Sequence, residues 1–275
     1  MSQSNNSGDD YVLGRGAAES VRLDAQHLLW KIHLGHLLHP SIKVTENLKI
    51  AEIGCGTAIW LLHLSHELPP TVKLYGFDVS SKQYPPKELW PENLCLLTMD
   101  SLKSPPADLM GQFDVVHVRM WASNVTRTTL PTLVSHIRSL LKPGGYLQWE
   151  EANLTRQVVV GAKAQEFETH INSLFKEAGL DYSWVTILPE ILRDEKFSIL
   201  KLQEDTLPPS LRQLGTNTYL LALQEIIRGI RSRLALPKES TYPYERALAE
   251  LLNQHTSGII YNWGPTFVLA QSSLQ

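Results

Sequence analysis

The 275-residue chain has few cysteines, no long apolar run and no excess of positive charge, and each absence excludes a class of protein. Its two cysteines, Cys55 and Cys95, cannot build a disulfide framework, and they fit a reducing compartment. No apolar stretch approaches the length of a membrane span, and the polar, acidic first ten residues are unlike a signal or transit peptide. The net charge of −3 argues against a dedicated nucleic-acid binder. We therefore expect a soluble cytoplasmic protein with no nucleic-acid or membrane partner and with an oligomeric state that the sequence leaves open.

The chain contains what a globular protein with a full core needs, since 43% of its residues are hydrophobic and 19% are charged. Strand-like and helix-like segments alternate along it. Strands are expected at residues 48–53, 72–77, 94–99, 113–118, 146–150, 197–203 and 259–270. Helices are expected at residues 58–68, 130–141, 164–178, 211–236 and 244–254, after a first helix that ends before Pro40. This alternation predicts an α/β fold with a mostly parallel sheet of seven strands and helices on both faces.

The first helix shows a clear amphipathic pattern. Its apolar residues recur at helical spacing and form one stripe that consists of Ala18, Val21, Ala25, Leu28, Leu29 and Ile32. Its polar residues lie on another face, namely Glu19, Arg22, Gln26 and His33. The pattern predicts a helix that packs on the protein through the apolar stripe.

The most informative stretch is Leu48–Thr57, where a buried strand breaks at Gly54 and Gly56 and leads into a helix. Two glycines after a strand let the backbone approach a ligand closely, and the helix N-terminus behind them offers free N–H groups. The stretch predicts a nucleotide-type site, with a purely structural glycine turn as the alternative. A dinucleotide fingerprint fails because Ile59 occupies its third position. The acid Glu52 ahead of the turn suits a cationic ligand group and would repel a phosphate.

Acids also follow the next two strands, at the sheet edge where ligands of parallel α/β folds bind. Asp78 lies 22 positions after Gly56, a spacing at which an acid can accept both ribose hydroxyls of an adenosine. A helix N-cap is the alternative for Asp78. Asp100 can accept a hydrogen bond from an adenine amino group, with Ser101 and Leu102 against the ring, or it only caps a turn.

Two later segments complete a recognisable series: Phe113–Met120 reads Phe-Asp-Val-Val-His-Val-Arg-Met, and a Lys-Pro-Gly-Gly turn precedes Tyr146–Glu150. Together with Glu52-x-Gly-x-Gly, Asp78 and Asp100-Ser, these segments resemble, in order over residues 48–151, the core of the S-adenosyl-L-methionine (SAM)-dependent methyltransferases of the Rossmann-like class. Four more stretches look closer still to small fungal methyltransferases of secondary metabolism, such as the gliotoxin-pathway N-methyltransferase type. They are Tyr11–Arg15, Arg22–His27, His39-Pro-Ser-Ile and Gln148-Trp-Glu-Glu.

The resemblance implies SAM as cofactor and S-adenosyl-L-homocysteine as product. The residues that it assigns to the cofactor are Glu52, Gly54, Gly56, Asp78, Val79, Asp100, Ser101, Leu102, Val118 and Arg119. Arg119, just past its strand, can meet the cofactor carboxylate or the acceptor. Tyr11 or Arg22 can hold that carboxylate if the first helix folds across the cofactor, and solvent exposure is the alternative for both.

The implied reaction is an in-line transfer of a methyl group to nitrogen or oxygen of a small molecule. Two residues are candidates for catalysis. Glu150 shares a strand face with Gln148 and can hydrogen-bond the acceptor or take its proton, unless it is a surface acid. His117 can act as a base, although a satisfied histidine in a strand is the commoner finding. No metal is expected, because no carboxylate or cysteine completes a known ligand spacing with His33, His36 and His39.

We expect four regions along the chain: a disordered tail at 1–10, a helical cap at 11–45, the SAM-binding core at 46–160, and a remainder at 161–275 that carries a helical substrate lid at about 205–255. No motif beyond residue 160 identifies the acceptor. Two alternatives stay open. One is a methyltransferase fold that catalyses another step, such as a cyclisation, with SAM bound but not consumed. The other is a methyltransferase-like regulator that acts through partner proteins.

Overall fold

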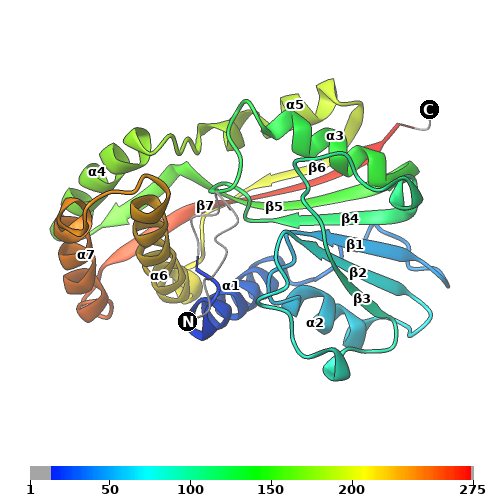
Figure 1. Ribbon diagram of the computed structural model, residues 1–275, viewed down its shortest axis with the longest axis horizontal. Coiled ribbons are helices and arrows are strands. Elements are labelled where there is room, and N and C mark those ends of the chain that lie inside the picture. Colours follow the sequence, from blue (N-terminus) through cyan, green and yellow to red (C-terminus); the bar gives the residue numbers. More distant parts are fainter. Residues whose placement is uncertain (1–13, 274–275) are drawn as a thin grey trace, which may run out of the picture.

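A seven-stranded sheet forms the centre of the protein in the computed structural model, which describes residues 14–273 (Figure 1). The strand order is β3-β2-β1-β4-β5-β7-β6, and only β7 runs antiparallel to its neighbours. The strands are β1 (Lys49–Ile53), β2 (Lys73–Asp78), β3 (Leu94–Thr98), β4 (Phe113–Arg119), β5 (Leu141–Val160), β6 (Phe197–Glu204) and β7 (Ile260–Ser272). The mostly parallel seven-stranded α/β fold predicted from the alternation of segments is therefore confirmed.

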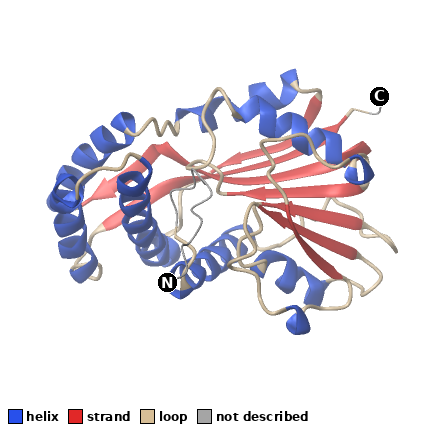
Figure 2. Ribbon diagram, in the orientation of Figure 1, coloured by secondary structure: helices blue, strands red, loops and turns tan. Residues whose placement is uncertain are grey.

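Helices cover both faces of the sheet (Figure 2). They are α1 (Ala17–Leu34), α2 (Ile59–Glu67), α3 (Leu130–Leu140), α4 (Ala162–Glu177), α5 (Leu188–Asp194), α6 (Pro209–Arg233) and α7 (Lys238–Asn253). A short 3₁₀ segment, η3 (Ser183–Ile187), precedes α5, and neither η3 nor α5 was expected from the sequence. Helices α6 and α7 lie between β6 and β7 in the chain, at the place where the sequence pattern put an insertion.

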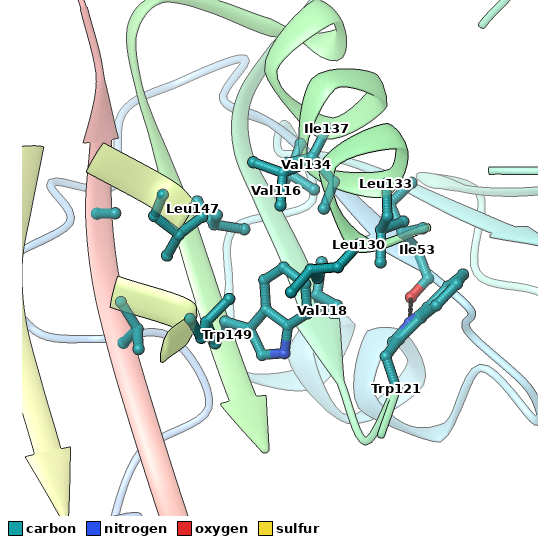
Figure 3. Close-up of a cluster of buried hydrophobic side chains, with 14 of the residues drawn as sticks. Ile53, Val116, Val118, Trp121, Leu130, Leu133, Val134, Ile137, Leu147 and Trp149 are labelled. Carbon is teal, nitrogen blue, oxygen red and sulfur yellow. Dashed lines mark hydrogen bonds between the residues drawn. The ribbon is translucent and has the colours of Figure 1, made fainter. Parts of the chain in front are cut away.

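The two sheet faces have separate hydrophobic cores, as the strand alternation requires. One core joins α3, η3 and α5 to the sheet, and Figure 3 shows Val118 and Trp149 from the strands meeting Leu130 and Leu133 of α3. The other core packs Trp60, Leu61 and Leu64 of α2 against the opposite face.

Strands β5 and β7 extend past the rest of the sheet as a two-stranded ribbon (Figure 1). They pair from Tyr146 to Asn153, and they pair again from Val158 onward after a break in the register. A third core joins this ribbon to α1, α4, α6 and α7. The ribbon and its helices therefore form a second body of packed structure beyond the ends of β1 and β4.

The predicted packing face of α1 is wrong. Its stripe residues Val21, Leu28 and Ile32 are 67%, 51% and 53% exposed, and only Leu29 of the larger stripe residues is buried. The polar residues Arg22 and Gln26 are buried instead, together with the neighbouring His27 and Trp30. The helix packs through polar contacts as well as apolar ones, and hydrophobic periodicity alone does not detect such a face.

Within residues 14–273, every helix is too short or too polar to cross a lipid bilayer.

Candidate active site

The glycine turn after β1 has the backbone conformation that its sequence requires. Gly54 and Gly56 have φ values of 71° and 53°, and the N–H groups of Gly54 and Cys55 donate to the carbonyl oxygen of Phe77 at 2.7 and 3.0 Å. A Cβ on Gly54 would lie 2.8 Å from the indole nitrogen of Trp121. Glycine is therefore needed at position 54 for both its conformation and its lack of a side chain.

Asp78 ends β2 beside this turn. One of its carboxylate oxygens accepts the Gly56 N–H at 3.0 Å, and the other accepts the Ser80 N–H at 3.1 Å. The next residue, Val79, is 51% exposed. The structure thus places an acid directly against the glycine turn and an exposed apolar side chain next to that acid in the chain.

Asp100 follows β3, one strand further along the same edge. Its carboxylate accepts the Leu102 N–H at 3.0 Å and pairs with Lys103 at 3.0 Å. Partial burial opposes ionisation, but the hydrogen bonds from Lys103 and Leu102 prevail and lower the pKa of Asp100. Ser101 is buried and Leu102 is 37% exposed, so the strand end combines a fixed carboxylate with an apolar surface.

Glu52, His117 and Glu150 form a buried row across three strands. The register pairs Glu52 of β1 with His117 of β4, and Arg119 of β4 with Glu150 of β5. The Nδ1 atom of His117 lies 3.2 Å from Glu52, and its Nε2 atom lies 3.3 Å from Glu150. Trp60 stacks on the imidazole ring with centroids 3.8 Å apart. The carboxylate Oε2 of Glu52 accepts no hydrogen bond from the described residues.

The electrostatics of the row favour an imidazolium between two carboxylates. Burial opposes the charged form of His117, but Glu150 and Glu52 prevail and raise its pKa. Burial likewise opposes ionisation of Glu150, but His117 and then Arg119 lower its pKa. The sequence predicts that Glu52 meets a cationic ligand group, whereas the structure brings its carboxylate to His117.

Arg119 lies between Glu150 and a histidine that sequence reasoning missed. Its guanidinium is 3.6 Å from Glu150 and 3.3 Å from Nδ1 of His27, whose Nε2 lies 2.9 Å from His63. Burial first, then Arg119 and His63, lower the pKa of His27 to about 3, so its ring is neutral at pH 7. The Arg22–His27 stretch that carries the family resemblance includes His27 but assigns it no role, because a helical histidine shows its role only once α1 is placed on the strand ends.

Helix α1 reaches the glycine turn through residues other than the predicted ones. Thr57 donates a hydrogen bond to Asp24 at 2.8 Å, and Leu23 lies 3.2 Å from where a Gly56 Cβ would stand. Arg22 is brought to Glu225 of α6 instead, in a buried ion pair with distances of 2.5 and 2.9 Å. The other N-terminal candidate, Tyr11, lies outside the described residues.

Val118, also predicted at the cofactor, is fully buried in the core beneath α3. Alternation along β4 puts Val118 on the face opposite to that of His117, and Figure 3 shows Val118 beside Trp149. The structure therefore groups Gly54, Gly56, Asp78, Val79, Asp100, Ser101, Leu102 and Arg119 at the strand ends and leaves Val118 under them.

A second acid that sequence reasoning did not select, Glu151, lies on the opposite face of β5. It accepts hydrogen bonds from the N–H groups of Trp121 at 2.8 Å and Ala152 at 3.0 Å, and from the Trp149 indole at 3.2 Å. Burial raises its pKa to about 7. Because Trp121 packs on Gly54 and donates to Ile53 at 3.1 Å, Glu151 anchors the segment that backs the glycine turn (Figure 3).

No three His, Cys, Asp or Glu side chains gather closely enough to hold a metal ion within the part of the chain that the structure describes. His33 lies 3.4 Å from Asp205, and the rings of His36 and His39 contact Phe267. These three histidines belong to the packing between α1 and the sheet.

The chain belongs to the methyltransferase domain family. The family model matches residues 35–183, which is more than half of the chain. This range includes the glycine turn, both strand-end acids and the buried row of Glu52, His117 and Glu150.

Among curated proteins, the chain is 36% identical over 149 residues to the methyltransferase grgD of Penicillium sp, covering 51% of this chain and 52% of that protein. It is 30% identical to the N-methyltransferase verN of Clonostachys rogersoniana, covering 51% and 50%. It is also 30% identical to the N-methyltransferase tcpN of Claviceps purpurea, covering 63% and 60%. The chain thus spans about half the length of the first curated relatives that it matches.

Solved structures share the fold at low sequence identity. The phosphoethanolamine N-methyltransferase 2 of Haemonchus contortus, in complex with phosphomonomethylethanolamine and S-adenosylhomocysteine, has a TM-score of 0.54 at 14% identity and covers 92% of this chain and 58% of that one. The [4+2]-cyclase SpnF has a TM-score of 0.52 at 16% identity and covers 94% and 82%. These likenesses establish the architecture of the chain and nothing further about its reaction.

Proposed function

We propose that the protein is a SAM-dependent methyltransferase that transfers a methyl group to nitrogen or oxygen of a small molecule. The observation that carries this proposal is the arrangement at Gly56 and Asp78, where a left-handed glycine donates its N–H to an acid at the end of the next strand. Exposed Val79 and Leu102 stand at the same edge. A nucleoside fits this edge, because it needs a carboxylate for its hydroxyls and apolar surface for its base.

When bound, SAM supplies a methyl group on a positively charged sulfonium, which an acceptor nitrogen or oxygen can displace in line. We assign the ribose hydroxyls to Asp78 and the adenine to Asp100, Ser101 and Leu102. We assign the cofactor carboxylate to Arg119, a cation at the end of β4. The protein then mainly aligns the two reactants and excludes water from them. We assign both roles to the residues at the strand ends and to the helices that cover them.

For Glu150 and His117 we propose a positioning role. A carboxylate whose pKa is lowered by His117 and Arg119 is a weak base at neutral pH. The same contacts fix its second oxygen 3.6 Å from Arg119, so Glu150 orients the guanidinium at the strand end. This assignment replaces the direct contact with the acceptor that the sequence suggested.

The names of two curated relatives favour nitrogen as the accepting atom, because verN and tcpN are called N-methyltransferases. The fold alone does not decide the reaction, since a cyclase shares it.

The proposal is tested by titrating SAM and S-adenosylhomocysteine into the protein by calorimetry and then assaying S-adenosylhomocysteine formation with an extract of fungal secondary metabolites. Formation of this product supports methyl transfer. Binding without product, together with conversion of a metabolite to an isomer of equal mass, supports the cyclisation alternative. Failure of SAM to bind contradicts both.

A further inference from the structure

Hydrogen bonds between side chains lead from Arg119, at the end of β4, through one histidine of α1 and one of α2 to the surface. Nη1 of Arg119 lies 3.3 Å from Nδ1 of His27, and Nε2 of His27 lies 2.9 Å from Nδ1 of His63. Nε2 of His63 lies 3.5 Å from Glu67, which also pairs with Lys31 at 2.6 Å. We call Arg119, His27, His63 and Glu67 the histidine series. His27 is 5% exposed and the side chain of His63 is 38% exposed, so the series begins inside the protein and ends at its edge.

The direction of each hydrogen bond in the histidine series is set by Arg119. A guanidinium only donates, so Nδ1 of His27 accepts and the proton of this ring lies on Nε2. That N–H donates to Nδ1 of His63, and the proton of a neutral His63 then lies on Nε2, toward Glu67. Burial first, then Arg119, lower the pKa of His27 to about 3, in agreement with a neutral ring. One tautomer of each ring therefore satisfies the whole series.

A neutral acceptor suits a cation that has to bind an anion. Two groups hold the guanidinium of Arg119, namely Glu150 at 3.6 Å and His27 at 3.3 Å. The carboxylate of Glu150 is shared with His117, which lies 3.3 Å from it. His27 carries no charge, so it directs the guanidinium and leaves the positive charge of Arg119 available to a ligand carboxylate.

We infer that His27 is a positioning residue that holds Arg119 toward the carboxylate of the cofactor, and that His63 fixes the tautomer in which His27 does so. The inference rests on the proposed function, which assigns the cofactor carboxylate to Arg119. A protonated His63 carries a hydrogen on Nδ1 as well, and two donors then face each other at 2.9 Å. His27 relieves this conflict only by moving its proton to Nδ1, which places a donor against Arg119. Protonation of His63 thus releases the guanidinium.

The charged and titratable groups around the two rings come from both helices and from β4 and β5. They are Asp24 and Lys31 of α1, one turn to either side of His27, Glu67 of α2, Arg119 and His117 of β4, and Glu150 of β5. Histidine is the side chain that gains a charge as the pH falls from 7.5 to 5.5. His27 stays neutral in this range and two carboxylates hold His117 as an imidazolium, so a pH change tests His63.

The experiment compares two ligands by calorimetry: S-adenosylhomocysteine, and 5′-methylthioadenosine, which contains the nucleoside but no amino-acid end. Both are titrated at pH 7.5 and pH 5.5 into the wild type and four variants. His27→Asn keeps an acceptor oxygen at the position of Nδ1, whereas His27→Gln places its amide at the position of Nε2 and leaves Arg119 without this acceptor. His63→Asn keeps an acceptor for His27 that takes up no proton. His66→Asn is the matched control, because His66 is an exposed histidine on the same helix as His63.

At pH 7.5 we expect His27→Gln to bind S-adenosylhomocysteine about tenfold more weakly than the wild type, in line with the loss of one hydrogen bond, and His27→Asn to recover part of this loss. The affinity for 5′-methylthioadenosine should stay the same in both variants. Between pH 7.5 and pH 5.5 the wild type and His66→Asn should lose affinity for S-adenosylhomocysteine by up to about tenfold, and His63→Asn should lose less.

Three results would overturn the inference: an unchanged affinity of His27→Gln for S-adenosylhomocysteine, an equal loss of affinity for both ligands, or a pH dependence that His63→Asn retains in full. The second result would identify His27 as a support of the fold that has no particular effect on Arg119. A wild type that binds neither ligand would instead contradict the proposed function, so the two failures are distinguishable.

Discussion

The strand-end half of the protein and the ribbon half are built in different ways. In the strand-end half, each predicted ligand residue is placed by a neighbouring turn or by strand register, as when Asp78 holds Gly56 or Glu52 faces His117. In the ribbon half, the polar contacts join segments far apart in the sequence, such as Arg22 with Glu225 and Tyr219 with Glu168. The family model matches residues 35–183, so it includes the glycine turn, both strand-end acids and α4, and it leaves out α1, α6, α7 and β7. We propose that the strand-end half binds the cofactor and that the ribbon half contributes to the choice of acceptor.

The largest effect is expected from Gly54→Ala, which should abolish SAM binding. The new Cβ would stand 2.8 Å from Trp121 on a residue with φ of 71°. Gly111→Ala is the matched control, because Gly111 has φ of 64° but no atom lies within 4 Å of where its Cβ would stand. Calorimetry measures the SAM affinity of both variants. Both carry the backbone strain and only Gly54→Ala carries the clash, so a lower affinity of Gly54→Ala reports the clash. If Gly54→Ala binds SAM as tightly as Gly111→Ala does, the turn does not touch the cofactor.

Arg22→Ala tests the join between the two halves. It leaves Glu225 buried without its cation, and such a change costs about 3–5 kcal/mol of unfolding free energy. Lys163→Ala breaks an exposed pair with Glu250 and should cost less than about 1 kcal/mol. Urea denaturation measures both. If the unfolding free energy falls by the same amount in both variants, the buried pair does not hold α1 to α6.

The pH dependence of stability should carry the signature of Glu151. Its pKa is raised from 4.5 to about 7 in the folded state, so its contribution is complete below pH 4.5 and is lost as the pH rises through 7. Between pH 8 and pH 5 the wild type should gain up to about 3 kcal/mol relative to Glu151→Gln. The lowered pKa of His27 makes stability fall as the pH falls, which is opposite to the effect of Glu151. Because both proteins contain His27, the difference between their unfolding free energies across this range reports Glu151 alone. Parallel pH profiles would contradict the assignment.

Glu150→Gln is expected to have the smallest effect. The amide keeps the contact with Gln148 but loses the charge that orients Arg119, to which we assign the cofactor carboxylate, so SAM affinity should fall up to about tenfold while kcat at saturating SAM changes less. A kcat that loses its dependence on pH near neutrality would instead identify Glu150 as a base. Unchanged SAM affinity would contradict this positioning role of Glu150.

Sequence reasoning succeeds where the signal is local. The glycine turn, the acids after β2 and β3, and the stripe of α3 depend on neighbours within a few positions, and the fold class follows from their order. It fails at α1, where Arg22 and His27 are buried by partners 203 and 92 residues away. The sequence also favours Glu150 and gives no role to Glu151. Alternation assigns the two residues to opposite faces of β5, but it does not predict which elements cover each face.

We propose that the strand-end edge binds SAM and that the methyl group of SAM is transferred to a small molecule. The direct measurement is incubation of the protein with methyl-labelled SAM and a pool of fungal metabolites, followed by quantification of S-adenosylhomocysteine and of label in each product. We predict one labelled metabolite formed in equal amount to S-adenosylhomocysteine, and none with Gly54→Ala. A metabolite converted without label, while SAM remains intact, would contradict the claim.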